Sequence, residues 1–441
     1  MTGMPVHVRR TCACPAGKRD GRRRNPCRAV IAVMSLVVLA VVAAPSAAVP
    51  TVVVGAQVLH ESGYADLLGK RVGLVTNHTA VVDGTHLVDL MHASGKVRLV
   101  ALFAPEHGLR GLKEDGVNFG ERRDDQSGAP VYSLYGTVRK PTPEMMRGLD
   151  LLLFDIQDIG ARFYTFISTM GLAMQAAAEA HIPFVVLDRP NPLGGEYVAG
   201  PPLDGEYASF TGRYPIPVTH GMTVGELALL IKGERMLPGL EGLDLRVVRM
   251  IGWRRGMQWP ETGLKWVRTS PNIPDFETAL LYPGICFFEG TSASVGRGTR
   301  EPFKLVGFPG IPAGELAHRL NSGNLPGVRF EAVTFTPRSI PGMSSNPKYQ
   351  DREVPGIKIT ITDPHAYRPV ETGVHLICAL YGSLGNRERE RFFRPAGFDH
   401  LAGTRTLRLA VERGAPPEEI ITAWKAGCGR FAETRARYLL Y

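Results

Sequence analysis

The sequence predicts an α/β protein with a parallel sheet in its first half and a smaller α+β region in its second half. From residue 70 onward, short apolar runs alternate with stretches of helical periodicity, which is typical of βαβ units. The chain has 441 residues, more than the roughly 250 to 300 at which a single hydrophobic core stops growing. We therefore expect two domains.

The first half of the chain is expected to form a doubly wound α/β region. Its strongest strand signal is the run from Leu149 to Ile156, which is apolar except for Asp150 and Asp155, as in a strand buried on both faces. The other elements follow from shorter apolar runs and from helical periodicity. Strands are expected at residues 72–76, 97–103, 149–156 and 183–187, and helices at residues 85–93 and 166–181.

The boundary between the regions is expected where the chain becomes proline-rich, which gives domains at residues 51–215 and 216–441. Thr223 and Glu226 have the spacing of a capping box, which predicts a helix to about Arg235. The later elements are predicted with mixed strand pairing. They are an irregular stretch at residues 251–283, strands at 328–335 and 357–362, and helices from about 372 and after 417.

Residues 1–48 are expected to be an export signal. A basic region ends at Arg28, an apolar run extends from Ala29 to Ala44, and the small residues up to Ala48 suit signal peptidase. An uncleaved anchor is the alternative, because the apolar run is just shorter than the roughly 20 residues that span a bilayer. Both interpretations place the protein outside the cytoplasm, as a secreted, periplasmic or envelope-associated protein.

The positive charge of the chain is concentrated in this leader. The formal charge is +9, but residues 1–48 hold eight Arg and Lys residues against one acid, so about +2 remains for the rest. A nearly neutral chain offers no electrostatic basis for binding a polyanion, which excludes nucleic acid as a partner. No stable membrane partner is expected beyond the leader itself.

Polar residues follow each of the four predicted strands. In open parallel sheets, ligands bind outside the carboxyl ends of the strands, so these residues are expected to share one site. The four polar segments begin at Asn77, Pro105, Asp155 and Asp188.

Glu106 is the candidate general acid. It follows an apolar strand and lies between Pro105, which fixes the backbone, and Gly108, which permits close approach of a ligand. A carboxyl group partly removed from water holds its proton more readily, as donation to a leaving-group oxygen requires. The alternative is a glutamate that only satisfies loop amides. His107 is expected to orient Glu106, bind substrate, or serve as a structural hydrogen-bond partner.

Asp155 and Asp158 are the candidates for a second catalytic carboxylate. Either could polarise water or stabilise an oxocarbenium ion, unless the acetamido group of the substrate takes that role. Capping of the following helix is the alternative for Asp155. Residues 286–299 form a Gly-, Ser- and Thr-rich loop, expected to leave an apolar strand, in which Glu289 and Arg297 are the charged residues. A phosphate loop is weakly supported, because the lysine that such a loop needs is missing.

Several long motifs resemble the exo-β-N-acetylmuramidases, a family long known as a domain of unknown function. The resemblance covers roughly residues 55–441, and the motifs occur in the expected order. These motifs are Gly73–Thr79, Phe103–Gly111, Asp155–Thr165, Asp188–Pro192, Ser270–Pro274 and Phe288–Thr299. One departure from the family pattern is Lys304, where an acidic residue is expected.

This resemblance implies a Rossmann-like catalytic domain and a smaller C-terminal domain that flank a cleft. It implies an exo-acting hydrolase that releases N-acetylmuramic acid from the non-reducing end of peptidoglycan fragments. The glutamate of the family's Pro-Glu-His-Gly motif corresponds to Glu106. The lactyl carboxylate of muramic acid needs a cationic partner, for which Arg110, Arg162 and Arg297 are expected to face the cleft. The candidate substrate-binding residues are Asn77, His78, His107, Arg110, Gln157, Arg162, Tyr164, Asp188, Arg189, Asn191, Glu289 and Arg297.

Two other functions remain open from the sequence. A non-catalytic cell-wall sugar-binding protein would use the same cleft without turnover. A metal-dependent hydrolase would use His78, His107 and Asp155, but the chain has no compact ligand spacing such as His-Glu-x-x-His. No cofactor and no metal site are predicted, and the three cysteines after the leader are too widely spaced for a zinc pattern.

Overall fold

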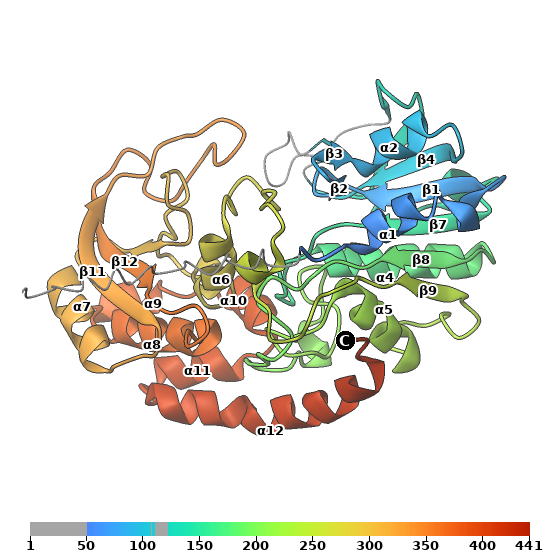
Figure 1. Ribbon diagram of the computed structural model, residues 1–441. Coiled ribbons are helices and arrows are strands. Elements are labelled where there is room, and N and C mark those ends of the chain that lie inside the picture. Colours follow the sequence, from blue (N-terminus) through green and yellow to red (C-terminus); the bar gives the residue numbers. More distant parts are fainter. Residues whose placement is uncertain (1–50, 107, 111–121) are drawn as a thin grey trace, which may run out of the picture. The chain divides into compact units, whose positions relative to one another are not determined.

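The computed structural model describes residues 51–106, 108–110 and 122–441 (Figure 1). Its first region is built on a seven-stranded sheet with the order β5-β6-β4-β1-β7-β8-β9. All neighbouring strands pair in parallel except β5, which is an antiparallel edge strand. The strands are β1 (Arg71–Thr76), β4 (Arg98–Ala104), β5 (Arg122–Arg123), β6 (Pro130–Ser133), β7 (Leu151–Asp155), β8 (Phe184–Leu187) and β9 (Leu245–Val248).

The parallel sheet and its four predicted strands are confirmed as β1, β4, β7 and β8. The central strand β7 is buried along its whole length, so its side chains can be apolar on both faces. Leu152 and Phe154 pack into one hydrophobic cluster, and Leu151 and Leu153 pack into another on the opposite face. Strands β6 and β9 are short and partly exposed, which is why their apolar signal is weak in the sequence.

Helices cover both faces of this sheet, as Figure 1 shows. The cluster on one face includes residues of α4 (Phe166–Glu179) and α5 (Val224–Gly233). The cluster on the other face includes residues of α1 (Gly55–Glu61) and α2 (Leu87–Ala93). The smaller elements of this region are η1 (Ala65–Leu67), β2 (Val81–Val82), β3 (Thr85–His86), α3 (Pro143–Met146), η2 (Gly205–Tyr207) and η3 (Trp259–Thr262).

The predicted capping box at the start of α5 is confirmed. The Thr223 hydroxyl accepts a hydrogen bond from the Glu226 amide at 3.2 Å, and the Glu226 carboxylate accepts one from the Thr223 amide at 3.1 Å. Asp188, at the end of β8, also accepts from the Gly225 amide at 2.8 Å. The exit of β8 is thus tied to the first turn of α5, where backbone amides lack partners within the helix.

The second region is α+β, as predicted, with a three-stranded sheet of order β10-β12-β11. The expected mixed pairing is wrong, because both strand pairs are antiparallel. Pairing direction depends on how the chain returns between strands, which local apolar patterns do not encode. The elements are α6 (Phe276–Ile285), η4 (Cys286–Gly290), β10 (Leu305–Gly307), α7 (Ala313–Ser322), β11 (Val328–Phe335), β12 (Val354–Ile361), α8 (Pro369–Gly382), α9 (Asn386–Glu390), α10 (Pro395–Ala402), α11 (Thr406–Glu412), α12 (Pro417–Arg435) and η5 (Ala436–Tyr438).

Helix α6 corrects two sequence predictions. Residues 276–283 are helical rather than irregular, and the Gly-, Ser- and Thr-rich loop leaves a helix rather than a strand. The side chain of Asp275 caps this helix by accepting from the Thr278 amide at 2.8 Å. Most of the helix is buried, so its apolar residues show no helical periodicity, and a short buried helix resembles a buried strand in sequence.

The described residues form one compact unit, and the large sheet includes chain from both sides of the boundary expected at residue 215, because β9 pairs with β8. The last helix also returns to the first region. Arg435 donates hydrogen bonds to the backbone carbonyls of Gly195 and His220 at 3.0 and 2.9 Å. The expected leader lies outside the described residues. Within the described part of the chain, no helix is long and apolar enough to cross a bilayer.

Candidate active site

The exits of β4, β1, β7 and β8 lie on the same edge of the sheet, because these four neighbouring strands are parallel. In register, Thr76 at the end of β1 pairs with Asp155 at the end of β7, and Val75 pairs with Phe103 of β4. The predicted polar loops therefore start at nearly the same level. This edge is where the sheet can present side chains to a ligand.

A cavity of about 500 Å³ adjoins this edge and includes Glu106 in its wall. Its volume lies within the range of small-molecule sites. The charged side chains that line it are Glu106, Arg139, Glu289 and Arg297. The other lining residues are aromatic, aliphatic, small or polar. They are Tyr135, Phe163, Tyr164, Thr165, Phe166, Ser209, Phe210, Thr211, Ser270, Ile273, Tyr282, Cys286, Phe303 and Leu401.

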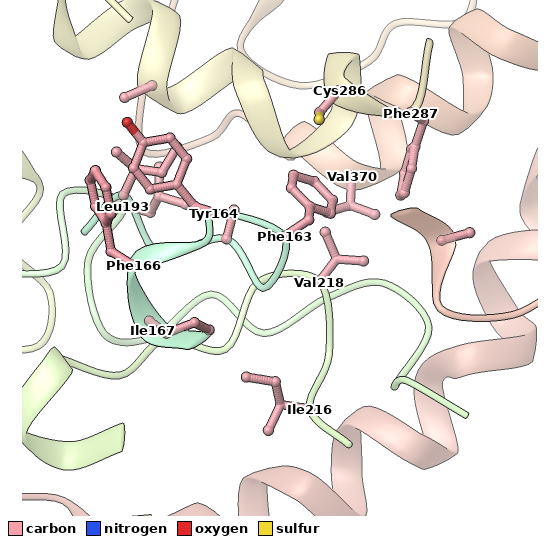
Figure 2. Close-up of a cluster of buried hydrophobic side chains, with 14 of the residues drawn as sticks. Phe163, Tyr164, Phe166, Ile167, Leu193, Ile216, Val218, Cys286, Phe287 and Val370 are labelled. Atoms are coloured by element: carbon pink, nitrogen blue, oxygen red, sulfur yellow. The ribbon is translucent and has the colours of Figure 1, made fainter. Parts of the chain in front are cut away.

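An aromatic cluster forms one wall of the cavity. The Tyr282 ring makes edge contacts with Phe163, Tyr164 and Phe303, at centroid distances of 5.5, 5.8 and 4.9 Å. Figure 2 shows Phe163 and Tyr164 on the segment that leads into α4, with Cys286 and Phe287 on the facing helical segment. Edge-to-face pairs of this kind hold rings in fixed orientations. The wall is therefore rigid and largely apolar.

Glu106 is held in this wall by a tight turn. The Gly108 amide donates to the Pro105 carbonyl at 3.1 Å, and Gly108 has a φ of +75°, which favours glycine. The turn follows directly on β4, and the Glu106 side chain is half-buried. Glu106 thus lies in the cavity wall at the exit of β4, and its role as a proton donor stays a prediction. His107 lies outside the described residues.

Glu289 and Arg297 form an ion pair in the cavity. Arg297 Nε donates to a carboxylate oxygen of Glu289 at 2.7 Å, and the Arg297 guanidinium lies 5.1 Å from the centre of the Phe303 ring. The flanking residues Gly296 and Gly298 have φ values of +74° and +80°. A side chain at either position would collide with a backbone carbonyl, so the tight path around Arg297 requires these glycines.

Lys348 supports the segment that carries Glu289. Its half-buried ammonium group donates to the carbonyls of Phe288, Thr291 and Ala293 at 3.2, 2.8 and 3.0 Å. Burial lowers the pKa of Lys348 to about 8. Lys348 could not be predicted from the sequence, because a lysine that binds carbonyls more than 50 positions away along the chain has no local signature.

Asp155 does not line the cavity. Its carboxylate forms a two-point ion pair with Arg189, at 2.5 Å to Nε and 2.9 Å to Nη2, and both side chains are buried. His78 likewise has a protein partner, since a ring nitrogen lies 2.5 Å from the Arg268 carbonyl oxygen. Among the described residues, no group of three or more His, Cys, Asp or Glu side chains could hold a metal ion.

Asp158 is also buried outside the cavity lining. Its carboxylate accepts from the Gly160 amide at 2.7 Å. Complete burial raises the pKa of Asp158 to about 7, although hydrogen bonds from the Gly160 and Ile159 amides oppose the rise. Roles for Asp155 and Asp158 in the reaction stay predictions.

The raised pKa of Asp158 predicts a pH-dependent effect on stability. Between about pH 4 and pH 7 the folded state keeps a proton that the unfolded state has released, so the free energy of unfolding falls as the pH rises through this window. Asp158→Asn keeps an oxygen that can accept the hydrogen bond, and it removes the group whose ionisation lowers the free energy of unfolding. We expect the free energy of unfolding of the variant, relative to that of the parent protein, to rise by up to about 4 kcal/mol between pH 4 and pH 7.

The measurement is urea unfolding of both proteins at several pH values from 4 to 8. Asp125→Asn is the matched control, because it removes one exposed carboxylate without changing a buried group. A constant difference between Asp158→Asn and the parent across the whole pH range would contradict the expectation.

Other predicted residues hold the loops at the strand exits through hydrogen bonds within the protein. The Asn77 side chain accepts from the Thr79 amide at 3.0 Å, and Gln157 donates to the Pro190 carbonyl at 2.7 Å. Asn191 donates to the Met222 carbonyl at 3.0 Å. Burial raises the pKa of Asp188 to about 7. These residues support the loops through hydrogen bonds to other parts of the protein. Their contact with substrate stays a prediction.

Of the three arginines expected to face the cleft, only Arg297 lines the cavity. Arg110 pairs with Asp89 and Asp124 at 2.9 and 2.8 Å. Arg162 is fully buried and donates to the carbonyls of Pro201 and Ile216 at 2.6 and 2.8 Å, and burial lowers its pKa to about 9. The sequence placed both on the correct loops, but it could not show that other partners already hold them.

Several lining residues were not predicted as site residues. They include Tyr135, Arg139, Phe210, Tyr282 and Phe303. Tyr135 and Arg139 follow the short strand β6, and Phe210 lies in an irregular segment after η2. None of these segments contains a motif that indicates chemistry. The departure at Lys304 also has a structural reason, since its ammonium pairs with Asp275 and Glu277 at 3.0 and 2.5 Å.

Comparisons with known proteins agree over most of the chain. Family models described as the N-terminal and C-terminal parts of exo-β-N-acetylmuramidase NamZ match residues 72–277 and 280–441. A Bacillus subtilis (strain 168) protein described as peptidoglycan β-N-acetylmuramidase NamZ is 44% identical over 395 residues, which are 89% of this chain and 92% of that protein.

Two crystal structures of DUF1343 family proteins from Bacteroides fragilis NCTC 9343 share this fold. Each is 36% identical and covers 88% of this chain and 99% of its own, with TM-scores of 0.81 and 0.73. The family models, the sequence identity and the fold all point the same way. The chain belongs to the NamZ family of exo-β-N-acetylmuramidases.

Proposed function

We propose that this protein is an exo-acting glycosidase that releases N-acetylmuramic acid from the non-reducing end of peptidoglycan fragments. The observation that carries the proposal is Glu106, a half-buried carboxyl group in the wall of a cavity of about 500 Å³. The cavity offers the rigid aromatic surface and the few charged groups that a sugar site needs. The 44% identical Bacillus subtilis relative is described as a peptidoglycan β-N-acetylmuramidase.

In this mechanism Glu106 donates a proton to the glycosidic oxygen as the bond to the leaving sugar breaks. The turn from Pro105 to Gly108 limits the backbone freedom of Glu106, which helps to keep the carboxyl group at the cavity. Glu289 lines the cavity, whereas Asp155 and Asp158 do not, and it is a further candidate for the second carboxylate.

The proposal is tested with a disaccharide of N-acetylmuramic acid linked to N-acetylglucosamine. We expect the purified protein to convert it into the two free sugars, identified by mass spectrometry, and to release muramic acid from longer fragments only at the non-reducing end. Binding without turnover would contradict the proposal and favour a sugar-binding protein. Activity that a chelator removes and zinc restores would favour a metal-dependent hydrolase instead.

The site of action proposed here is outside the cytoplasm, where the substrate occurs. The support is the order of basic, apolar and small residues in positions 1–48. Peptidoglycan-derived muramic acid saccharides are the proposed partners. N-terminal sequencing of protein recovered from the cell envelope or medium tests this, and a start at Val49 is the expected result.

A further inference from the structure

The cavity contains two arginines with different surroundings. Arg297 is paired with Glu289 at 2.7 Å, so a carboxylate placed there would meet the negative charge of Glu289. Arg139 lines the same cavity, and its guanidinium has no carboxylate partner among residues 51–106, 108–110 and 122–441. The positive charge of Arg139 is therefore the one that an anionic group on the substrate can engage.

The position of Arg139 is set by an aromatic ring. Its guanidinium carbon lies 4.6 Å from the centre of the Phe210 ring, which is a cation–π contact. In such a contact the cation lies over the face of the aromatic ring and is held by the charge distribution of the ring. The N–H groups of the guanidinium are not used as hydrogen-bond donors in this contact, so they remain available to acceptors. The exposed Arg139 side chain is thus held at the cavity without using its hydrogen-bond donors on another residue of the described chain.

Phe210 is itself held by a tight turn. The Ser209 amide donates to the Gly212 carbonyl at 2.8 Å, and the Gly212 amide donates back to Ser209 at 3.3 Å. The hydroxyl groups of Ser209 and Thr211 lie 3.1 Å apart. Ser209, Phe210 and Thr211 all line the cavity. The turn therefore brings an aromatic support for Arg139 and two hydroxyl-bearing residues to the same part of the wall.

We propose that Arg139, supported by Phe210, binds the lactyl carboxylate of the muramic acid residue and so determines substrate specificity. The inference rests on the proposed function, and it names the group that recognises the acidic sugar. N-acetylmuramic acid differs from N-acetylglucosamine by the lactyl group, whose carboxylate matches the planar fork of a guanidinium. A muramic acid residue whose lactyl carboxylate is blocked as an ester or amide loses this ion pair.

The test compares two aryl muramides, one with a free lactyl carboxylate and one with its methyl ester. Arg139→Gln is expected to raise the KM for the free acid by roughly 10- to 100-fold, the usual range for a lost hydrogen-bonded charge pair. The kcat for the acid should change less than about threefold, and kcat/KM for the ester should fall far less than for the acid, because the ester carbonyl can still accept a hydrogen bond but forms no ion pair. Arg139→Lys should recover part of the loss, because it restores the charge without the fork.

Arg352→Gln is the matched control. Arg352 is an exposed arginine that also lies over an aromatic ring, Tyr349 at 5.7 Å, but it does not line the cavity. This variant should leave both substrates unaffected. Phe210→Leu provides a second variant that keeps the charge but removes the aromatic support. It is expected to raise the KM for the free acid by roughly three- to tenfold and to spare the ester.

Two results would overturn the inference. One is an equal loss on acid and ester in Arg139→Gln, which would mean that Arg139 supports the cavity without recognising the carboxylate. The other is a selective loss on the free acid in Arg297→Gln but not in Arg139→Gln, which would place the carboxylate at Arg297. Failure of the proposed function would look different, because the unsubstituted protein would then hydrolyse neither muramide.

Discussion

Replacing Glu106 with glutamine is expected to lower the rate of cleavage of a muramic acid–glucosamine disaccharide by roughly 10²- to 10⁴-fold, the usual contribution of a general acid. Glutamine keeps the size of the side chain but has no proton to donate. The loss should be smaller on a nitrophenyl muramide, because nitrophenolate leaves without protonation. The measurement is kcat/KM on both substrates, with thermal unfolding to show that the fold is intact.

Glu353→Gln is the control for this variant, since it removes an exposed carboxylate just before β12, away from the cavity. We expect this control to keep full activity on both substrates. Full activity of Glu106→Gln on the disaccharide would refute the assignment of Glu106 as the proton donor. An equal loss on both substrates would instead indicate that Glu106 acts by binding.

Asp155→Ala is expected to destabilise the protein by about 3–5 kcal/mol, the usual cost of removing one partner of a buried ion pair. Both partners are inaccessible, with side-chain exposures of 0% for Asp155 and 5% for Arg189. The substitution leaves the guanidinium of Arg189 without its carboxylate in a site that water does not reach. The measurement is the free energy of unfolding in urea.

A second ion pair, on the protein surface, is a matched control for Asp155 and Arg189. Asp150 forms the same two-point ion pair with Arg71, but these side chains are 36% and 44% exposed. Asp150→Ala should therefore cost much less, because water replaces the lost partner. Equal losses in the two variants would contradict the account. Activity measured per folded molecule of Asp155→Ala then shows whether Asp155 also takes part in the reaction.

Much of the fold follows from local sequence patterns. Strand β7 was predictable because buried parallel strands are continuously apolar, and α5 because Thr223 and Glu226 have capping-box spacing. Helix α6 was missed because a short helix that is buried on most sides has the same apolar run as a strand. Strand β9 was missed because its residues are partly exposed and its partner β8 lies more than 50 residues earlier.

The sequence alone identified the glutamate at the exit of β4, the loops that share the sheet edge and the family to which the chain belongs. These depend on short motifs, in which proline, glycine and polar residues act on their immediate neighbours. Only the tertiary structure decided which charged groups line the cavity. Arg162 is buried and Arg110 is paired, whereas Arg139 lies at the cavity on the ring of Phe210. The physical reason is that the environment of a charge is set by groups distant in sequence, through contacts that exist only after the chain has folded.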